Sequence, residues 1–394
     1  MFQRDLEVKM FKSGMPVYGK EFIDRKQHII KFNTYIKNNQ HIMIKAPRRY
    51  GKTSLIVHLF EQNNYNKIYI DVKRATSLQT LAEQIIDEIY KYAGVENIIS
   101  SAKESIVNLF KQLKATLKID LSIAEFTIET LEKKDKKLIN EVDFFLYAMD
   151  LVEEISKKQN LSIKFAFDEF QDILSIADNK ILDKLRSVIQ HHQNVTYIFL
   201  GSIESIMNKI FSSKSSAFFH FARIIELDGL NTDELKEFCK DFFNSNKIFY
   251  DDFLFTIIDY LEGHPYYTMK TLQTIYYKTL EESSKNIEKD DCVEALTIAF
   301  FETKSYLEEV IEKIKQKKYH HSVIWNLANG SKNENIDSAT LYKTYKSLED
   351  MGYIKKVDRG EYQITDIFLK ILLQQNNDTR LIDRKIDFVS LEKY

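Results

Sequence analysis

The chain has 394 residues, of which 44% are hydrophobic and 29% are charged, and its formal net charge is −2. That length predicts two or three domains, and that composition is typical of a soluble globular protein. No apolar run approaches the roughly 20 residues that span a bilayer, and the near-neutral charge excludes an overall attraction to nucleic acid or acidic lipid. Cys239 and Cys292 lie far apart, and residues 1–7 lack an apolar signal core, so we expect a reduced, cytoplasmic protein without membrane contact.

The strongest motif lies between His41 and Ile56. This stretch reads as a short buried strand, a turn and a helix that runs from Thr53 to about Asn63. A strand and a helix that flank G-x-x-x-x-G-K-[ST] form a P-loop, in which backbone N–H groups surround the phosphates of a nucleotide. The predicted nucleotide contacts are Ala46, Pro47, Arg48, Arg49, Tyr50, Gly51, Lys52, Thr53 and Ser54.

Three residues of this motif have a clear chemical role. Gly51 lets the backbone approach an anion, because it has no Cβ. Lys52 can reach the β- and γ-phosphates, and the Thr53 hydroxyl is placed to bind Mg²⁺. Ala46 replaces the first glycine of the pattern. A chance Gly-Lys-Thr in a lysine-rich chain is the alternative, and the flanking strand and helix argue against it.

A turn bounded by proline and glycine precedes this motif, from Pro16 to Gly19. A helical pattern follows it, to about Lys37. We expect Tyr18 and Gly19 to touch the base or the sugar of the nucleotide, and a plain surface turn is the alternative.

A second strand, 67–72, and a helix, about 77–92, follow the P-loop helix. The charged region 95–140 is expected to be helical, with the run 131–137 as a solvated face. After a further helix at about 140–159, a strand over 161–167 ends in Asp168 and Glu169. Asp168 would complete the shell of the metal, and Glu169 would polarise the attacking water. An acidic pair in this place also occurs as a helix N-cap.

Two more strands carry polar residues at their ends. The strand 195–200 is followed by Gly201 and Ser202, where Ser202 is either a sensor of the γ-phosphate or a helix cap. Arg223 opens a strand over 223–227, close to the other strand-end chemistry. It would neutralise charge on a transferring phosphoryl group, unless it is an ordinary surface arginine.

The remainder of the chain is predicted to be helical until its last part. A helical pattern covers 231–301 and breaks at Gly263-His264-Pro265, where His264 is expected to be a cap or loop residue and not a metal ligand. Helices over 319–329 and 338–351 then precede two short strands around Gly360, which together predict a winged helix.

Winged helices bind DNA with one helix in the major groove, or serve as protein-interaction surfaces. The two alternatives stay open, because 318–394 contains 12 Lys and Arg against 11 Asp and Glu, a net of +1. The candidate DNA contacts are Lys343, Lys346, Lys355, Lys356 and Arg359.

Taken in order, these motifs resemble the archaeal-type ATPase family of the STAND class of P-loop NTPases, which are relatives of the AAA+ proteins. The resemblance covers roughly residues 15–370. It rests on Val17-Tyr18-Gly19-Lys20-Glu21, on the P-loop, on Phe167-Asp168-Glu169-Phe170-Gln171, on Gly201-Ser202, on Arg223, on Gly263-His264-Pro265-Tyr266-Tyr267 and on Tyr362-x-Ile364-Thr365-Asp366. Lys20 departs from the arginine that is usual in the first motif.

The resemblance implies an α/β fold with a five-stranded parallel P-loop sheet of the AAA+ type, a helical lid and a C-terminal winged helix. The expected domains are 1–230, 231–303 and 304–394. It also implies that Pro265 lies near the base, that Arg223 is linked to the nucleotide, and that the protein can form homo-oligomers.

The sequence therefore predicts a switch driven by ATP and Mg²⁺, with slow hydrolysis. Lys52 and Thr53 would bind phosphate and metal, Asp168 would complete the metal shell, Glu169 would position water, and Ser202 and Arg223 would report the γ-phosphate. Two alternatives remain. One is a DNA-binding regulator in which the nucleotide is structural, and the other is a component that acts by binding another protein.

Overall fold

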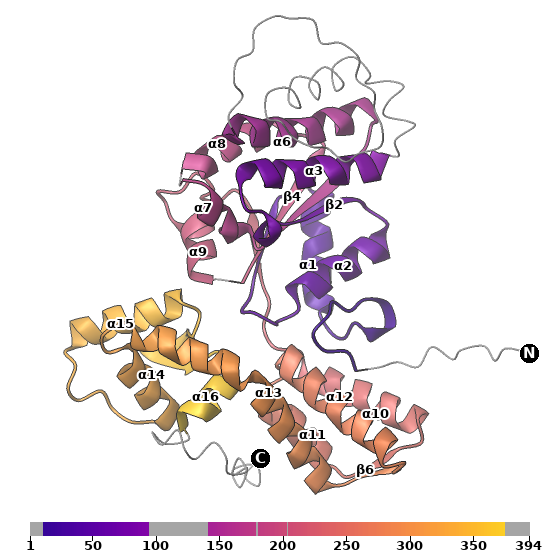
Figure 1. Ribbon diagram of the computed structural model, residues 1–394, viewed down its shortest axis with the longest axis vertical. Helices are drawn as coiled ribbons and strands as arrows, with labels where there is room; N and C mark the ends of the chain where they lie inside the picture. The colour runs from indigo at the N-terminus through magenta and orange to yellow at the C-terminus, as the bar shows by residue number, and fades with distance from the viewer. Residues whose placement is uncertain (1–10, 94–140, 179, 203, 375–394) are drawn as a thin grey trace, which may run out of the picture.

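The computed structural model describes residues 11–93, 141–178, 180–202 and 204–374. The predicted helical region 95–140 falls outside them. The described chain forms three parts, which follow one another in sequence: an α/β unit, a helical unit and a C-terminal unit (Figure 1).

The α/β unit is built on a five-stranded sheet in which every neighbouring pair of strands is parallel. The strands lie in the order β2-β3-β4-β1-β5, so the P-loop strand β1 has β4 on one side and β5 on the other. Their bounds are β1 Ile42–Lys45, β2 Asn66–Asp71, β3 Ile163–Asp168, β4 Val195–Gly201 and β5 Arg223–Glu226. The prediction of a five-stranded parallel sheet is confirmed.

Helices cover both faces of this sheet, which explains why its central strands are apolar almost throughout. On one face, α1 (Lys26–Lys37) and α2 (Lys52–Asn63) pack against Ile42, Ile44 and Ala166. On the other face, helices pack against aromatic side chains of β3 and β4 such as Phe165 and Phe199. These helices are α3 Leu78–Ala93, α6 Glu141–Lys158, α8 Lys180–Ile189 and α9 Glu204–Ser212.

Short helical segments complete the unit at the carboxyl ends of the strands. They are η1 Gly19–Glu21, η2 Val72–Arg74, η3 Phe170–Asp172 and α7 Ile173–Ile176. Because α2 begins at the end of β1 and η3 begins just after the end of β3, side chains from both connections meet at one edge of the sheet.

The helical unit consists of α10 Thr232–Ser245, α11 Phe253–Tyr260, α12 Pro265–Glu281 and α13 Lys289–Lys315. Two short strands that the helical pattern did not predict, β6 Phe249–Tyr250 and β7 Asn286–Ile287, pair in parallel within it. Helix α13 continues without a break across residues 303 and 304, where the sequence predicted a domain boundary.

The C-terminal unit has three helices and one antiparallel hairpin. The hairpin joins β8 Ile354–Asp358 and β9 Glu361–Ile364, and the helices are α14 His320–Asn329, α15 Ser338–Asp350 and α16 Ile367–Gln374. One apolar core runs through the helical and C-terminal units, and Phe11 of the amino-terminal segment also packs into it. Among the residues described, none of the helices combines the length and the apolar character that crossing a membrane requires.

Candidate functional site

The P-loop connects β1 to α2 at the carboxyl edge of the sheet. Gly51 adopts the left-handed conformation with φ 82°, and α2 begins at the next residue. The Lys52 side chain is only 6% exposed, and its Nζ donates to the carbonyl oxygens of Ala46 and Pro47, both at 2.9 Å. The loop is thus wrapped around an ammonium group beside the N-terminus of a helix, where an anion is electrostatically favoured.

The acidic pair lies across the sheet from this ammonium group, as the sequence predicted. Asp168 is the last residue of β3, and its Oδ2 accepts a hydrogen bond from Thr53 Oγ1 at 3.0 Å. This contact joins residues 115 positions apart. The P-loop threonine and the strand-end aspartate therefore form one polar cluster.

Glu169 is held by a dense set of donors. Its Oε2 accepts from Ser202 Oγ at 2.7 Å, from Ser202 N at 3.1 Å and from Gln171 Nε2 at 2.7 Å. Burial raises the pKa of Glu169, but the hydrogen bonds from Gln171 and Ser202 and the charge of Lys52 outweigh it, and the pKa lies below its ordinary value. The side chain is therefore an ionised acceptor at neutral pH.

Tyr69 joins this polar cluster, and the sequence analysis missed it. Its hydroxyl donates to Asp168 Oδ2 from the neighbouring strand β2. Burial, and then the charge of Asp168, raise the pKa of Tyr69, so the phenol stays protonated. A signal was available, because Tyr69 lies between Ile68 and Ile70, two residues before Asp71.

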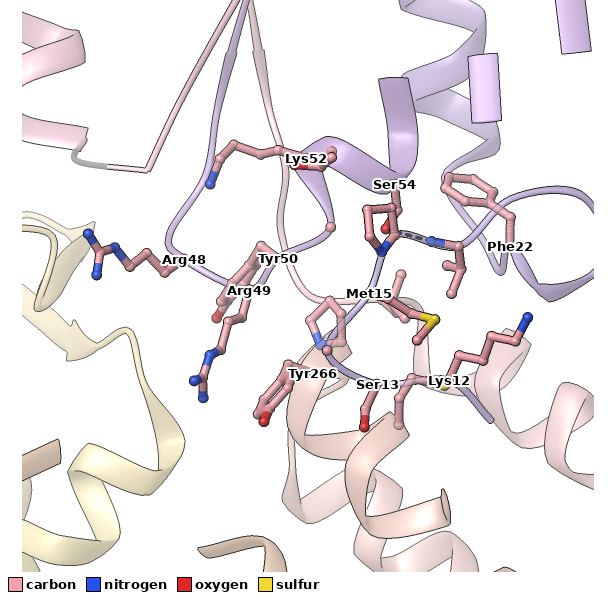
Figure 2. A pocket seen from close by; sticks show the side chains of 18 of the residues that line it. Lys12, Ser13, Met15, Phe22, Arg48, Arg49, Tyr50, Lys52, Ser54 and Tyr266 are labelled. Atoms are coloured by element: carbon pink, nitrogen blue, oxygen red, sulfur yellow. Dashed lines mark hydrogen bonds between the residues drawn. The ribbon is translucent and has the colours of Figure 1, made fainter. Parts of the chain in front are cut away.

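The entry segment before α1 is fastened to the P-loop helix. Val17 N donates to Ser54 Oγ at 3.2 Å, which is the hydrogen bond drawn at Ser54 in Figure 2, and Gly19 N donates to His58 Nδ1 at 3.2 Å. Tyr18 is 56% exposed. The turn is thus held against α2 through Val17 and Gly19, while the contact of Tyr18 and Gly19 with a nucleotide stays a prediction.

A cavity of about 510 Å³ opens between these elements and the helical unit (Figure 2). Its lining includes Met15, Pro16 and Val17 of the entry segment and Pro265 and Tyr266 of α12. Its volume is typical of a small-molecule site. Six cationic side chains line it against three carboxylates, which favours a polyanionic ligand: Lys12, Arg25, Arg48, Arg49, Lys52 and Lys73 against Glu21, Asp168 and Glu169.

Several predicted contacts do not line this cavity. Tyr18, Gly19, Ala46 and Pro47 are absent from its wall, whereas Arg48 to Ser54, Asp168, Glu169, Ser202 and Pro265 are part of it. Ala46 and Pro47 contribute indirectly, because their carbonyl oxygens accept hydrogen bonds from Lys52, which does line the cavity.

Arg223 is the clearest correction to the predicted site. It pairs in register with Ile42, the first residue of β1, so it lies at the amino edge of the sheet, opposite the P-loop. Its Nε donates to Gln40 Oε1 at 3.3 Å. In a parallel sheet the first and last residues of a strand face opposite edges, and the prediction that Arg223 lies near the strand-end chemistry is therefore wrong.

Arg25 is a second residue that the sequence analysis missed. It is 3% exposed, and it donates to the carbonyl oxygens of Asp228 at 2.7 Å and of Tyr50 at 3.1 Å. Asp24 and Arg25 both have positive φ, 60° and 74°. No local pattern predicts two successive left-handed residues without glycine, and this turn is what aims Arg25 into the interior.

The start of α12 forms the opposite wall of the cavity. His264 caps this helix, since its Nδ1 accepts from Tyr267 N at 3.3 Å, which confirms the predicted role. Burial lowers the pKa of His264 to about 3, so the ring is neutral. Gly263 has φ +65°, and a Cβ there would lie 2.0 Å from the carbonyl oxygen of Leu230. Only glycine fits where this turn meets the connection from β5.

Two P-loop side chains extend to the other parts of the molecule. The guanidinium of Arg49 lies 4.1 Å from the ring centre of Tyr266 and 5.2 Å from that of Tyr306. The Tyr50 hydroxyl donates to the carbonyl oxygen of Thr365 at 3.1 Å, next to the hairpin. In Figure 2, Arg49 runs toward Tyr266, while Arg48 points toward the C-terminal unit.

Comparison with solved structures places this fold. No protein-family model and no curated protein matches the sequence. The Walker-type ATPase PABY2304 of Pyrococcus abyssi superposes with a TM-score of 0.63 at 16% identity, over 92% of this chain and 99% of that one. The ORC2 protein of Aeropyrum pernix, in ADPNP–ADP complexes, superposes with a TM-score of 0.58 at 11% identity, over 95% and 96% of the two chains. The chain therefore has the α/β fold of these two proteins, and the likeness extends through all three parts.

Proposed function

We propose that this protein binds and hydrolyses ATP, and that the state of the nucleotide controls the C-terminal unit, in the manner of a STAND switch. The α/β unit would be the ATPase domain, the helical unit its lid, and the C-terminal unit a winged helix. The observation that carries the proposal is the polar cluster at the carboxyl edge of the sheet. There the P-loop carbonyl of Ala46 holds the Lys52 ammonium group, and the next residue, Thr53, donates a hydrogen bond to Asp168 at the end of β3.

Nucleotide binding follows from the charge and shape of the cavity. The P-loop and the N-terminus of α2 offer backbone N–H groups to phosphates. The ammonium group of Lys52 would exchange its hydrogen bonds to two carbonyl oxygens for hydrogen bonds to phosphate oxygens. The base would then lie toward Met15 and Pro265, at the far end of the cavity. The complexes of the A. pernix structure with ADPNP and ADP are consistent with a nucleotide in this fold.

The same residues fit a Mg²⁺ ion that arrives with the nucleotide. Among the described residues, no group of three or more His, Cys, Asp and Glu side chains is arranged to hold a metal by itself. Mg²⁺ in nucleotide sites is bound by one or two protein oxygens together with phosphates and water. Thr53 Oγ1 and Asp168, which are in hydrogen-bond contact, would hold it. The ion would neutralise part of the negative charge of the phosphates.

Glu169 is the residue best placed to orient the attacking water. In the structure its Oε2 is occupied by Ser202 and Gln171. Ser202 would thus hold Glu169 back, and a γ-phosphate that attracted the Ser202 hydroxyl would release it. Bound ATP would then be hydrolysed slowly until its γ-phosphate engages Ser202.

Arg49 and Tyr50 are the candidates for transmitting the nucleotide state. Both belong to the P-loop, which must adjust when phosphates bind, and both contact other parts of the chain. A shift of the loop would therefore alter the contacts with Tyr266 on α12 and with the Thr365 carbonyl at the same time. The arrangements with and without bound nucleotide would then differ in these contacts, as a two-state switch requires.

The test is a comparison of Glu169→Gln with the unaltered protein. The variant should bind ATP with unchanged affinity and hydrolyse it at least about 100-fold more slowly, because general-base catalysis contributes that much. Phosphate release and nucleotide affinity are the measurements. Glu61→Gln, on the exposed side of α2, is the matched control and should leave both unchanged. Hydrolysis by Glu169→Gln at the unaltered rate would contradict the role of Glu169.

DNA binding through the C-terminal unit is a second candidate. The observation that favours it is an exposed face of α15 with Tyr342, Lys343 and Lys346, beside a hairpin tip with exposed Lys356 and Arg359. Phosphate contacts from such residues make binding fall steeply with salt. Titration of duplex DNA at two salt concentrations, with and without ATP, tests this candidate, and affinity that does not depend on salt would exclude it.

A further inference from the structure

The Tyr69 hydroxyl donates its hydrogen bond to Asp168, the residue proposed to bind the metal. Tyr69 pairs in register with Ala166 on β3, and Asp71 pairs with Asp168. Residues two apart on a strand share a face, so Tyr69, Ala166 and Asp168 lie on the side covered by α1 and α2. Alanine leaves room for the ring to lie beside it, and the hydroxyl then reaches Asp168 Oδ2.

The bonds of Asp168 fix how its carboxylate can be used. Oδ1 accepts from Glu169 N at 2.9 Å, and Oδ2 accepts from Thr53 Oγ1 at 3.0 Å and from Tyr69. A carboxylate has about four lone-pair positions, so these three bonds leave one, on Oδ1. Two donors on one oxygen also hold the carboxylate in a single orientation.

The chemistry of the donor suits a site for a cation. Asp71, Asp168 and Glu169 bring three carboxylates to this edge of the sheet. A lysine or an arginine in the place of Tyr69 would neutralise Asp168 and repel Mg²⁺. A phenol donates a hydrogen bond and adds no charge.

We propose that Tyr69 is a positioning residue for Asp168, which sets the orientation of the carboxylate and thereby the Mg²⁺ affinity of the nucleotide complex. This inference rests on the proposed ATP·Mg²⁺ site. Residues that orient a metal-binding side chain typically change metal affinity 10- to 100-fold when they are replaced.

Tyr69→Phe removes the hydroxyl and keeps the ring. Tyr65→Phe is the matched control, because Tyr65 also lies near β2 and donates through its hydroxyl, but to Asn33 Oδ1 at 3.3 Å, away from Asp168. Each variant is titrated with MgCl₂ at a fixed concentration of a fluorescent ATP analogue, and its affinity for the analogue is also measured in EDTA. The affinity in EDTA reports a loss of folded protein, because a smaller binding-competent fraction lowers that affinity too.

Tyr69→Phe should need about tenfold more Mg²⁺ than the unaltered protein for half of the Mg²⁺-dependent gain in affinity. Its affinity in EDTA should be unchanged, and Tyr65→Phe should match the unaltered protein in both. A midpoint for Tyr69→Phe that equals that of Tyr65→Phe, or lies below it, overturns the inference while the proposed function stands. If the unaltered protein binds no nucleotide, the proposed function fails and this inference fails with it.

Discussion

The two walls of the cavity are held together in different ways. On the sheet wall, Lys52, Thr53, Asp168 and Glu169 bond to the P-loop, to one another or to Ser202, all within the α/β unit. On the junction wall, hydrogen bonds join segments that are distant in the sequence: Arg25 reaches Asp228, in the connection between β5 and α10 and 203 positions away, and Tyr50 reaches Thr365, 315 positions away.

This difference indicates a division of labour. The sheet wall is arranged before a ligand arrives, and pre-arranged donors and acceptors are what catalysis needs. The junction wall depends on how three parts of the chain sit together, so it is the wall that a change of nucleotide state can rearrange. Substitutions on the junction wall should therefore alter stability and coupling more than the chemistry.

Gly263→Ala should have the largest effect on the junction wall. The left-handed backbone and the clash with the Leu230 carbonyl should together reduce the free energy of unfolding by about 3 kcal/mol. Gly330→Ala is the matched control, because Gly330 has φ +66° and no atom within 4 Å of an added Cβ, so it should cost only about 1 kcal/mol. Urea unfolding measures both, and equal losses would show that the close approach at Gly263 is unimportant.

Protonation of His264 should destabilise the same wall at acidic pH. The pKa is about 3 in the folded protein and 6.5 in the unfolded chain, so the unfolded state binds the proton first as the pH falls. Between pH 7.5 and pH 5 this should cost about 2 kcal/mol. His264→Asn keeps a capping side chain and should remove that loss.

Urea unfolding of His264→Asn at the two pH values checks this prediction. His220→Asn, at an exposed histidine, is the control and should keep the pH dependence of the unaltered protein. If His264→Asn kept it as well, burial of His264 would not be its source.

Tyr50→Phe should have the smallest effect on stability and should show most directly how the walls are linked. Loss of the hydrogen bond to Thr365 should cost about 1 kcal/mol. The proposed switch predicts that ATP changes amide exchange in the hairpin β8–β9, and Tyr50→Phe should reduce that change. Tyr147→Phe, at a tyrosine 46% exposed on α6, is the control. An ATP response of the hairpin that is unchanged in Tyr50→Phe would separate the P-loop from the C-terminal unit.

The sequence predicted the sheet wall better than the junction wall, for a physical reason. Strand ends and the P-loop have local signatures, so the sequence alone could place Lys52, Thr53, Asp168, Glu169 and Ser202 at one edge of the sheet. The prediction for Arg223 was wrong because it did not take into account that the first and last residues of a strand lie at opposite edges of the sheet.

The contacts of the junction wall have no such signature. The side chain of Arg25 reaches its partners only because two left-handed residues turn it inward, and its acceptors are backbone carbonyls, which no side-chain pattern reveals. Tyr69 likewise reaches Asp168 through strand register and the small side chain of Ala166. Such contacts depend on how distant segments pack together, whereas the spacing of apolar residues in the sequence is enough to predict helices and strands.

The most direct test of this account is the equilibrium affinity for ATP of the unaltered protein and of Lys52→Ala. Lys52→Ala should weaken binding at least about 100-fold, because hydrogen bonds between an ammonium and phosphates are each among the strongest that proteins make. Lys67→Ala, at an exposed lysine paired with Glu61, should bind as the unaltered protein does. Saturable binding that depends on Lys52 is the predicted result. Equal affinity in Lys52→Ala, or no binding by the unaltered protein, would contradict a nucleotide at the P-loop.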